Sequence, residues 1–456
     1  MTLDSGKLRD RLRSVVGSVM PPAASAAPLQ APVPIASDIG AVEAEAALEQ
    51  ALGGGWRHGD EGRAFMVRRR VPPDARHGRS CVADFAEAIH TGMPESTLLA
   101  PGGAALPLLF FDLETTGLSG GAGTHAFLVG CGWFDADGGF VTEQHLLVDY
   151  ASERGMLALV ARDLTRGGAI VSFNGKSFDA PVLESRYAFH RLAFPVQGRP
   201  HLDVLHPSRR FWGGVDEEGC SLGVLERRVL GATRVGDVAG AEIPSRYFRF
   251  VRTGDASVLS EVLEHNRVDL LSLAGVTARL FWLIASGADA TSSAREALAL
   301  GWIYRRGDRT ERAAEAFERA IRLASEQRCG GRLGADPAGA DAASGAHAAN
   351  RALVAEAVHA LALMARRSRR HADAAARWQQ LLEVPGCPPS LTREAAEALA
   401  IHHEHRARDL AAARMFALKT LEEGTNGARS DAVRHRLARI ERKMISERRL
   451  LFPSSP

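Results

Sequence analysis

The sequence predicts an α/β domain with a mixed sheet flanked by helices, followed by an all-α region of helical repeats. From about residue 106 to 286, short apolar stretches typical of strands alternate with stretches of helical periodicity. After about residue 290 no strand pattern remains, and Ala, Leu, Arg and Glu dominate. We therefore expect short helices with a Pro/Ala-rich linker, an α/β domain and a helical domain, over residues 1–60, 61–288 and 289–450.

Composition and charge narrow the class of protein. The 456 residues carry a formal net charge of +2, so any affinity for nucleic acid must come from local patches. The five cysteines are far apart and form no C-x-x-C, which argues against a zinc knuckle and fits a reducing cytoplasm. No apolar run approaches the roughly 18 residues of a membrane span, and the N-terminus lacks a signal-peptide core. We expect a cytoplasmic protein without a membrane partner.

The predicted elements follow in order along the chain. Amphipathic spacing predicts helices over 4–20 and 41–52, separated by a linker over 21–37, and an edge strand that starts at Ala64 ends at two prolines. The mixed sheet is then expected to begin with three antiparallel strands, over 106–118, 127–134 and 144–149. A crossover helix over 152–166 then leads to a fourth, parallel strand over 169–173. Three further helices are predicted around 178–187, 221–231 and 255–286.

The first predicted strand of the sheet ends in two carboxylates. Asp112 and Glu114 are two residues apart, so on a strand their side chains share one face. Two carboxylates at the end of an apolar strand are costly unless a divalent cation compensates them. The alternative is that both are solvated at a strand edge or cap the following turn.

Two further acids follow at places that could meet this pair. Asp179 comes just after the fourth strand, and its loop is expected over the same sheet edge, although turn chemistry alone also explains it. Asp269 lies close to the apolar stripe of the long helix, where a carboxylate is rarely left alone. His265 is one helical turn earlier on the same face, and it could simply bond Asp269.

Four carboxylates from two strand ends and a helix suit metal-assisted chemistry. Mg²⁺ and Mn²⁺ prefer oxygen ligands, and two such ions roughly 3.5–4 Å apart can promote phosphodiester hydrolysis. The sequence contains neither a G-x-S-x-G motif nor a Walker loop that would indicate another chemistry.

The motifs resemble those of a known family. Asp112-x-Glu114-Thr115-Thr116-Gly117, Asn174-Gly-x-x-Phe178-Asp179 and Asn266-x-x-Asp269 are similar to the three exonuclease motifs of the DEDD branch of the ribonuclease H-like superfamily. The second motif looks like that of family-B polymerase proofreading domains. It looks closer still to the YprB-like bacterial group, in which such a domain precedes tetratricopeptide repeats. The resemblance covers about residues 60 to 290.

The resemblance implies a function for particular residues. It implies a 3′–5′ exonuclease with Asp112, Glu114, Asp179 and Asp269 as ligands of two Mg²⁺ or Mn²⁺ ions. It also implies that Thr115, Thr116 and Leu118 lie near the 3′-terminal nucleotide and Asn174 near the site. One departure is that His265 stands where the tyrosine subgroup has Tyr. A histidine there could orient or deprotonate the attacking water, or it could be a substitution that slows catalysis.

Three basic residues are candidates for phosphate contact. Lys176, Arg209 and Arg210 lie near the predicted sheet edge, although solvated surface positions explain them equally well. The sequence thus predicts a metal-dependent 3′–5′ exonuclease that acts on single-stranded DNA or RNA. The alternative is a catalytically weak or inactive nuclease fold that binds nucleic acid or serves as a scaffold.

The C-terminal region carries weak repeats. Leu300, Gly301, Tyr304, Ala313, Phe317 and Ala320 follow the small and large spacing of a tetratricopeptide helix pair, although Ala297 holds the usual Trp position. A Gly/Ala/Asp-rich stretch over 329–349 is expected to be a disordered insertion. Such repeats would dock a protein partner, and the alternative is an unrelated helical bundle.

Overall fold

The computed structural model divides into two compact units, Met1–Ala47 and Leu48–Pro456. It describes residues 38–100, 102–117, 123–213, 219–234, 236–330, 340–422 and 428–451. The helix expected over 4–20 and the linker over 21–37 lie outside the described residues. The helix expected over 41–52 is present as α2 (Asp38–Leu52).

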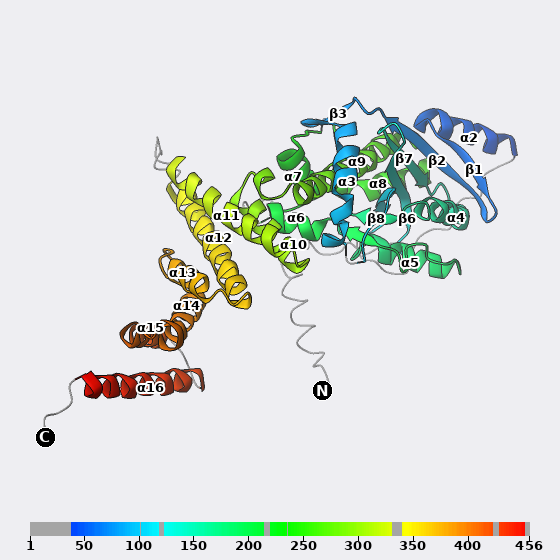
Figure 1. Ribbon diagram of the computed structural model, residues 1–456. Coiled ribbons are helices and arrows are strands. Elements are labelled where there is room, and N and C mark those ends of the chain that lie inside the picture. The colour runs from blue at the N-terminus through cyan, green and yellow to red at the C-terminus, as the bar shows by residue number, and fades with distance from the viewer. Residues whose placement is uncertain are drawn as a thin grey trace, which may run out of the picture. The chain divides into compact units, whose positions relative to one another are not determined.

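A seven-stranded mixed sheet forms the centre of the α/β domain (Figure 1). Its strand order is β1-β2-β7-β6-β5-β8-β9, and only the pairs β5–β8 and β8–β9 are parallel. The strands are β1 (Gly55–Gly59), β2 (Gly62–Val71), β7 (Phe140–Leu146), β6 (Ala126–Phe134), β5 (Leu108–Thr115), β8 (Ala169–Ser172) and β9 (His201–Asp203). The predicted mixed sheet, with three antiparallel strands and a crossover to a parallel one, is confirmed.

Two details of the sheet differ from the prediction. The strand that starts near Ala64 is β2, and it is not an edge strand, because β1 pairs along its other side. Its prolines follow the last paired residue, Val71, so they remove no ladder hydrogen bond. The third strand begins at Phe140 rather than Gln144, because the tight turn at Gly138 lets β6 and β7 pair directly from it.

Helices cover both faces of the sheet (Figure 1). Phe110 packs in a core cluster with residues of α3 and α9, and its neighbour Phe111 packs in another cluster with residues of α4. The helices of this domain are α3 (Val82–Gly92), η1 (Met93–Leu98), η2 (Tyr150–Ser152), α4 (Glu153–Leu164), α5 (Asp179–Phe189), α6 (Leu205–Trp212), α7 (Leu222–Leu225), η3 (Glu226–Leu230), η4 (Gly240–Glu242), α8 (Ile243–Thr253), η5 (Ala256–Leu259), α9 (Ser260–Ser286) and η6 (Ala288–Ala290). Two short strands, β3 (Arg76–His77) and β4 (Ser80–Cys81), form a separate pair.

Helix α9 is the longest apolar element of this domain. The stretch Ala256–Ser286 is long and apolar enough to cross a membrane by length and composition, so the expectation that no apolar run approaches that length is wrong. Of its most apolar window, 72% is buried inside the protein. Packing against the sheet and α3 therefore accounts for the apolar character of α9.

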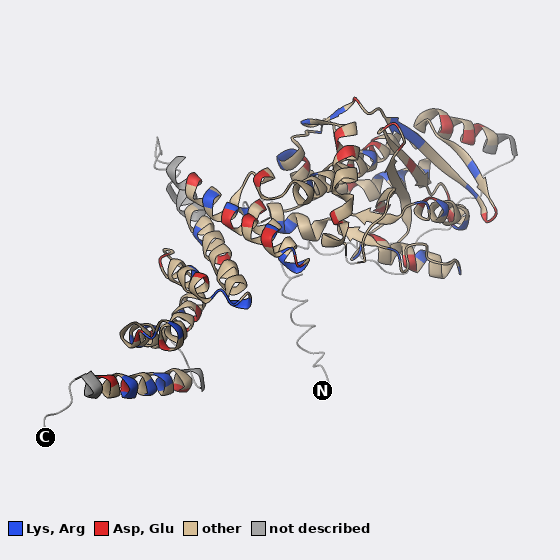
Figure 2. Ribbon diagram, in the orientation of Figure 1, with Lys and Arg blue, Asp and Glu red and all other residues tan. Residues whose placement is uncertain are grey.

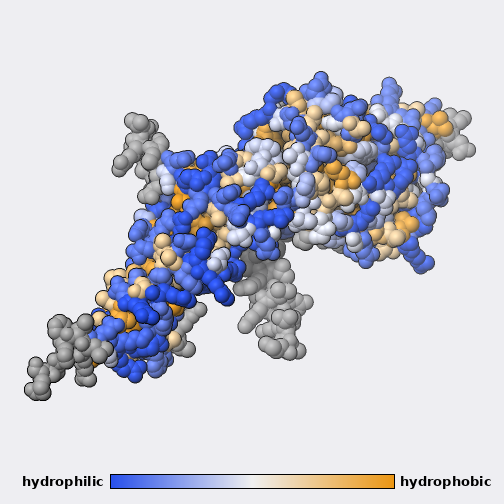
Figure 3. All heavy atoms as spheres, in the orientation of Figure 1, coloured by the Kyte–Doolittle hydropathy of each residue, from blue (hydrophilic) through white to orange (hydrophobic). Residues whose placement is uncertain are grey.

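The C-terminal region is entirely helical in the residues described. Its helices are α10 (Ala294–Arg306), α11 (Thr310–Gly330), α12 (Ala340–Arg367), α13 (His371–Leu382), α14 (Pro389–His402), η8 (His403–Ala407), α15 (Leu410–Glu422) and α16 (Ala428–Leu451). Lys and Arg outnumber Asp and Glu along α16 (Figure 2). On the face shown in Figure 3, hydrophobic residues form small separate spots among hydrophilic ones. Helices α11 and α12 extend into the stretch expected to be disordered, of which 331–339 lie outside the described residues.

The first two C-terminal helices share a core with the α/β domain. Residues of α9, α10 and α11 belong to one continuous hydrophobic cluster. Polar contacts add to it, because Trp212 Nε1 donates to Glu296 Oε1 (2.8 Å) and Tyr304 donates to the Ile284 carbonyl oxygen (2.6 Å). The start of the helical region is therefore packed into the α/β domain rather than tethered to it.

Candidate active site

Strand β5 places two carboxylates on the face of the sheet that α9 covers. Asp112 pairs with Gly130 on β6, and Glu114 pairs with Leu128, so both side chains emerge on the same face of the strand. The register shifts between Glu114 and Thr115, the last two residues of β5, and Thr115 then pairs with Ala126. Such an irregularity re-aims the chain at the end of the strand. Both carboxylates are half-buried.

A buried amide chain holds Asp112 in position. Asn266 on α9 donates from Nδ2 to Asp112 Oδ2 (2.9 Å), and Gln144 on β7 donates from Nε2 to Asn266 Oδ1 (2.9 Å). Both amides are fully buried. Gly130 makes this approach possible, because a Cβ there would lie 2.2 Å from Asn266 Oδ1. The third motif therefore supplies a positioning amide in addition to its acid.

Asp179 is carried by a tight loop after β8. Asn174 has a positive φ of 65°, a conformation that Asn tolerates better than most residues. A Cβ on Gly175 would lie 2.5 Å from the Ser172 side chain and 2.9 Å from Asp179 Oδ2. Asp203, at the end of β9, accepts hydrogen bonds from the Asn174 and Lys176 backbone N–H groups at 2.8 and 3.2 Å. The loop is thus fixed by a neighbouring strand.

Asp269 comes from α9 and meets an arginine. Arg234 donates from Nη2 to Asp269 Oδ1, and its Nη2 also lies 2.6 Å from Glu226 Oε2. Glu226 is buried in the π-helical turn η3 and also accepts a hydrogen bond from Ser272 (2.7 Å). Sequence reasoning missed Arg234 and Glu226. Arg234 lies in a loop without hydrophobic periodicity, and within the helix predicted over 221–231 no spacing relates Glu226 to the four acids.

His265 lies between two carboxylates. Its Nδ1 is 2.7 Å from Asp237 Oδ1, and its Nε2 is 3.4 Å from Asp269 Oδ2. Burial raises the pKa of Asp237, but the bond with His265 and the charge of Arg234 lower it overall. An ionised Asp237 accepts the Nδ1 proton, which leaves Nε2 of a neutral imidazole as the free base. Asp237 was not anticipated from the sequence.

Burial and neighbouring charges shift the pKa values of all four acids. Burial and the charges of Asp269, Glu114 and Asp179 raise the pKa of Asp112 well above its usual value. Burial and the charges of Asp269 and Asp179 raise the pKa of Glu114 to about 8. Burial and Asp203 raise the pKa of Asp179 to about 7. Burial also raises the pKa of Asp269, although Arg234 and His265 offset part of that rise.

This donor set fits divalent cations. Among the described residues, Glu114 and Asp179 have no hydrogen-bond or ion-pair partner, and Asp112 is held only by a neutral amide. Of the four acids, Asp269 is the one that Arg234 and His265 contact in the described residues. Carboxylates grouped without enough positive charge are stabilised by Mg²⁺ or Mn²⁺, which take oxygen ligands. The four acids together could therefore hold such ions.

Some of the predicted substrate residues lie beside these acids. Thr115 ends β5 and Thr116 follows it; Thr115 Oγ1 donates to the Gly117 carbonyl oxygen and Thr116 Oγ1 accepts from the His125 backbone N–H. Lys176 is exposed on the loop that leads to Asp179. Leu118 lies outside the described residues.

The arginine pair of α6 has other neighbours. The positive charge of Arg209 acts on Cys220, and that of Arg210 lowers the pKa of Arg306 on α10, after the larger effect of burial. Neither arginine is among the charges that shift the pKa of the four acids. Helix α6 also contacts α10 through the hydrogen bond between Trp212 and Glu296, and phosphate contact by this arginine pair stays a prediction.

A second cluster could hold a metal ion on the other face of the sheet. Glu143, His145 and Asp163 are buried, and their ligand atoms all lie within 4.8 Å of one another. His145 Nε2 is 2.7 Å from Asp163 Oδ2, while Arg68 lies 2.9 Å from Glu143 and Arg166 3.3 Å from Asp163. The alternation of β7 could have shown that Glu143 and His145 share a face, but not that Asp163 of α4 meets them. Arg68 and Arg166 already balance negative charge in this second cluster. Of the four acids of the first site, only Asp269 has an arginine partner among the described residues, so a bound cation would stabilise the first site more than the second.

Comparison with known proteins agrees with this fold. Residues 109–281 match the model of the RNase_H superfamily, and this range contains all four acids. The chain is 29% identical over 384 residues to a Bacillus subtilis (strain 168) protein named "Uncharacterized protein YprB". The match covers 82% of this chain and 85% of that protein. The α/β domain is thus ribonuclease H-like, which supports a nuclease.

The raised pKa values predict how metal binding depends on pH. Between the ordinary carboxyl pKa and about 7 to 8, the folded apo protein binds more protons at Asp179 and Glu114 than the unfolded chain does. The free energy of unfolding therefore falls as pH rises through this window. Mn²⁺ must displace these protons, so its affinity should rise from pH 6 to pH 8. Calorimetry with Mn²⁺ at both values, and thermal unfolding with and without Mn²⁺, measure this.

The matched variant for this prediction is Asp112→Asn, with the exposed Asp60→Asn as its control. At pH 8 Asp112→Asn should raise the stability of the apo protein by about 1–3 kcal/mol, because it removes a buried unpaired charge. It should also lose the stabilisation by Mn²⁺, whereas Asp60→Asn should change neither. An apo protein that Asp112→Asn destabilises would contradict the proposed repulsion.

The close approach at Gly130 gives a second prediction. Gly130→Ala should displace Asn266 from Asp112, lower the free energy of unfolding by about 1–3 kcal/mol and weaken Mn²⁺ binding. Gly223→Ala is the control, because a Cβ there meets nothing within 4 Å. Urea unfolding and calorimetry measure the two effects. Equal behaviour of both variants would show that the amide chain does not position Asp112.

Proposed function

We propose that this protein is a metal-dependent 3′–5′ exonuclease that hydrolyses phosphodiester bonds of single-stranded DNA or RNA. One observation carries the proposal. Asp112, Glu114, Asp179 and Asp269 converge on one face of a ribonuclease H-like sheet, and two of them have no partner among the described residues. The direction of cleavage rests on the resemblance of the three motifs to DEDD exonucleases.

The residues divide the chemistry between them. Two Mg²⁺ or Mn²⁺ ions bound by the four carboxylates would supply Lewis-acid stabilisation of the charge that develops on the phosphate. His265 can take the proton of the attacking water at Nε2, because Asp237 holds the Nδ1 proton. Asn266 keeps Asp112 oriented toward the other acids. Thr115 and Thr116 would contact the terminal nucleotide at the end of β5.

A second candidate is a weak or inactive nuclease fold that binds nucleic acid. The contact of Arg234 with Asp269 favours it, because a guanidinium already neutralises one of the four acids. Metal binding would then have to displace Arg234 or proceed with three free carboxylates. Calorimetry in which the wild type binds no Mn²⁺ would favour this candidate over the exonuclease.

We also propose that the helical region forms tetratricopeptide-like repeats and binds a protein partner in the cytoplasm. Gly301 of α10 supports the repeats, because a Cβ there would lie 2.6 Å from the Phe317 ring of α11. This is the small and large pairing that such helix pairs need. Ile401, Met415 and Ile445 are exposed hydrophobic side chains of this region, and they suit a protein interface.

Loss of the acids should abolish nuclease activity. Asp112→Asn with Asp179→Asn should reduce Mg²⁺- or Mn²⁺-dependent release of mononucleotides by at least about a thousandfold, because the remaining acids cannot hold the ions. The assay uses 5′-labelled and 3′-labelled single-stranded DNA and RNA, so that the direction of cleavage is read directly. Asp60→Asn should keep full activity. A wild type that is inactive with both ions on both substrates would overturn the exonuclease.

The position of His265 gives a further prediction. Asp237→Asn should lower kcat by about 10- to 100-fold, because the imidazole loses the acceptor that fixes its tautomer. His265→Gln should lower kcat to a similar extent and flatten the acidic limb of the pH profile. The exposed Asp60→Asn is the control. A pH profile that neither His265→Gln nor Asp237→Asn alters would exclude His265 as the base.

A further inference from the structure

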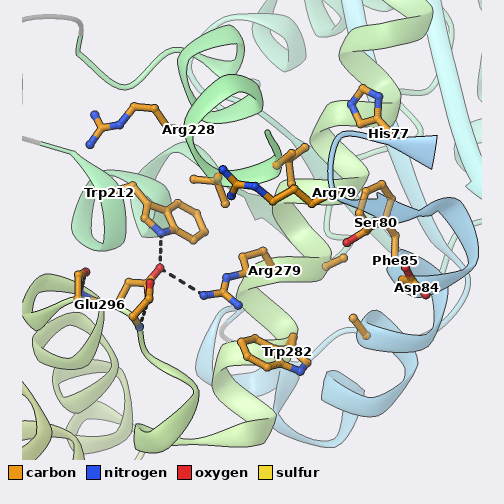
Figure 4. Close-up of a pocket in the computed structure, with 17 residues that line it drawn as sticks. His77, Arg79, Ser80, Asp84, Phe85, Trp212, Arg228, Arg279, Trp282 and Glu296 are labelled. Atoms are coloured by element: carbon orange, nitrogen blue, oxygen red, sulfur yellow. Dashed lines mark hydrogen bonds and ion pairs between the residues drawn. The ribbon is translucent and has the colours of Figure 1, made fainter. Parts of the chain in front are cut away.

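A cavity of about 660 Å³ lies apart from the four acids (Figure 4). Side chains from the β3–β4 segment, α3, α6, η3, α9 and the start of α10 line it. Its volume falls within the roughly 300–1,000 Å³ of small-ligand pockets. None of Asp112, Glu114, Asp179 and Asp269 lines it.

The lining is rich in arginine. Arg79, Arg228 and Arg279 face two carboxylates, those of Asp84 and Glu296. Asp84 accepts a hydrogen bond from the Cys81 backbone N–H (2.7 Å). The Glu296 carboxylate accepts from Trp212 Nε1 (2.8 Å) and lies 3.5 Å from Arg279 (Figure 4). The three arginines outnumber the two carboxylates, so the lining keeps a net positive charge for an anion.

Arg79 is the cation best placed to meet a ligand. Its side chain is exposed and packs over Gly231, where a Cβ would lie 2.9 Å from Arg79 Nε. Within the described residues its guanidinium has no hydrogen bond or ion pair. In Figure 4 this side chain extends toward Trp212. An arginine held in place by packing but without a partner can bind a phosphate at little conformational cost.

Two indole rings add flat surfaces to the same cavity. Trp282 on α9 is 37% exposed, and the Arg279 guanidinium stacks on it at 4.4 Å from the ring centroid. Trp212 and Arg279 both contact the Glu296 carboxylate, as Figure 4 shows. Aromatic rings and arginine planes both stack with nucleobases, and each stacked base contributes roughly 1–3 kcal/mol. The cavity thus joins a phosphate-binding edge to a base-stacking surface.

We propose that this cavity binds a nucleotide unit, with its phosphate at Arg79 and Arg279 and its base against Trp282. The assignment to nucleic acid rests on the proposed function. A neighbouring cavity of about 580 Å³ supports the link, because Arg234, Asp237 and His265 line it. His77 lines both cavities. A strand whose end lies at the four acids could continue past His77, and a released mononucleotide would have the same chemistry.

The test measures binding to the full chain in EDTA, so that the acids bind no metal. The probes are single-stranded hexathymidylate, adenosine 5′-monophosphate and inorganic phosphate, studied by calorimetry. Arg79→Glu should weaken binding of the nucleotide probes by about tenfold or more, because it replaces a cation with an anion. Arg57→Glu changes the charge equally on the exposed strand β1 and should have no effect. Trp282→Leu should weaken binding of the nucleotide probes but leave binding of inorganic phosphate unchanged.

The outcomes separate the source of the ligand and the two proposals. Binding of hexathymidylate identifies the strand as the source, and binding of the monophosphate alone identifies the product. The cavity proposal is overturned if neither binds, or if Arg79→Glu and Arg57→Glu behave alike. A protein that binds nucleotides here but has no nuclease activity would overturn the proposed function alone. An active nuclease that binds the nucleotide probes equally well with and without Arg79→Glu would overturn this inference alone.

Discussion

Repulsion among four half-buried carboxylates is the constraint on which the rest of this site depends. The fold brings Asp112, Glu114 and Asp179 together without a cationic side chain to balance them, and burial, followed by neighbouring negative charges, raises their pKa values. Such a cluster destabilises the apo protein at neutral and higher pH. A packed scaffold must therefore hold the acids in place, and bound cations would remove the cost.

The scaffold holds the acids with neutral and backbone groups. Asn266 and Gln144 form an amide chain to Asp112 through the space that Gly130 leaves. Asp203 fixes the loop of Asp179 through backbone N–H groups instead of another side-chain cation. Neutral donors orient a carboxylate without cancelling the charge that a metal needs. This explains why the supporting residues are amides and glycines.

Asp269 is the exception, and it links the site to the surrounding surface. Arg234 and His265 both contact it, Glu226 and Asp237 hold these two side chains, and Ser272 donates to Glu226. The same network borders the cavity next to the site, and His77 leads from there to the arginine-lined cavity. The network around Asp269 and the arginine-lined cavity are thus connected by side chains on and around α9.

The sequence by itself predicted three antiparallel strands, a crossover to a parallel fourth, the helix over 255–286 and the motifs that carry the four acids, because these depend on local periodicity and on motifs with fixed spacing; it did not predict β1 or β9. It also determined that Asp112 and Glu114 share a face, since alternation is a property of any strand. Only the tertiary structure decided that Arg234 meets Asp269 and that Asp237 orients His265. It also decided that the charge of Arg210 acts on Arg306 of α10. These contacts join segments without periodicity across loops, and packing rather than local sequence sets their geometry.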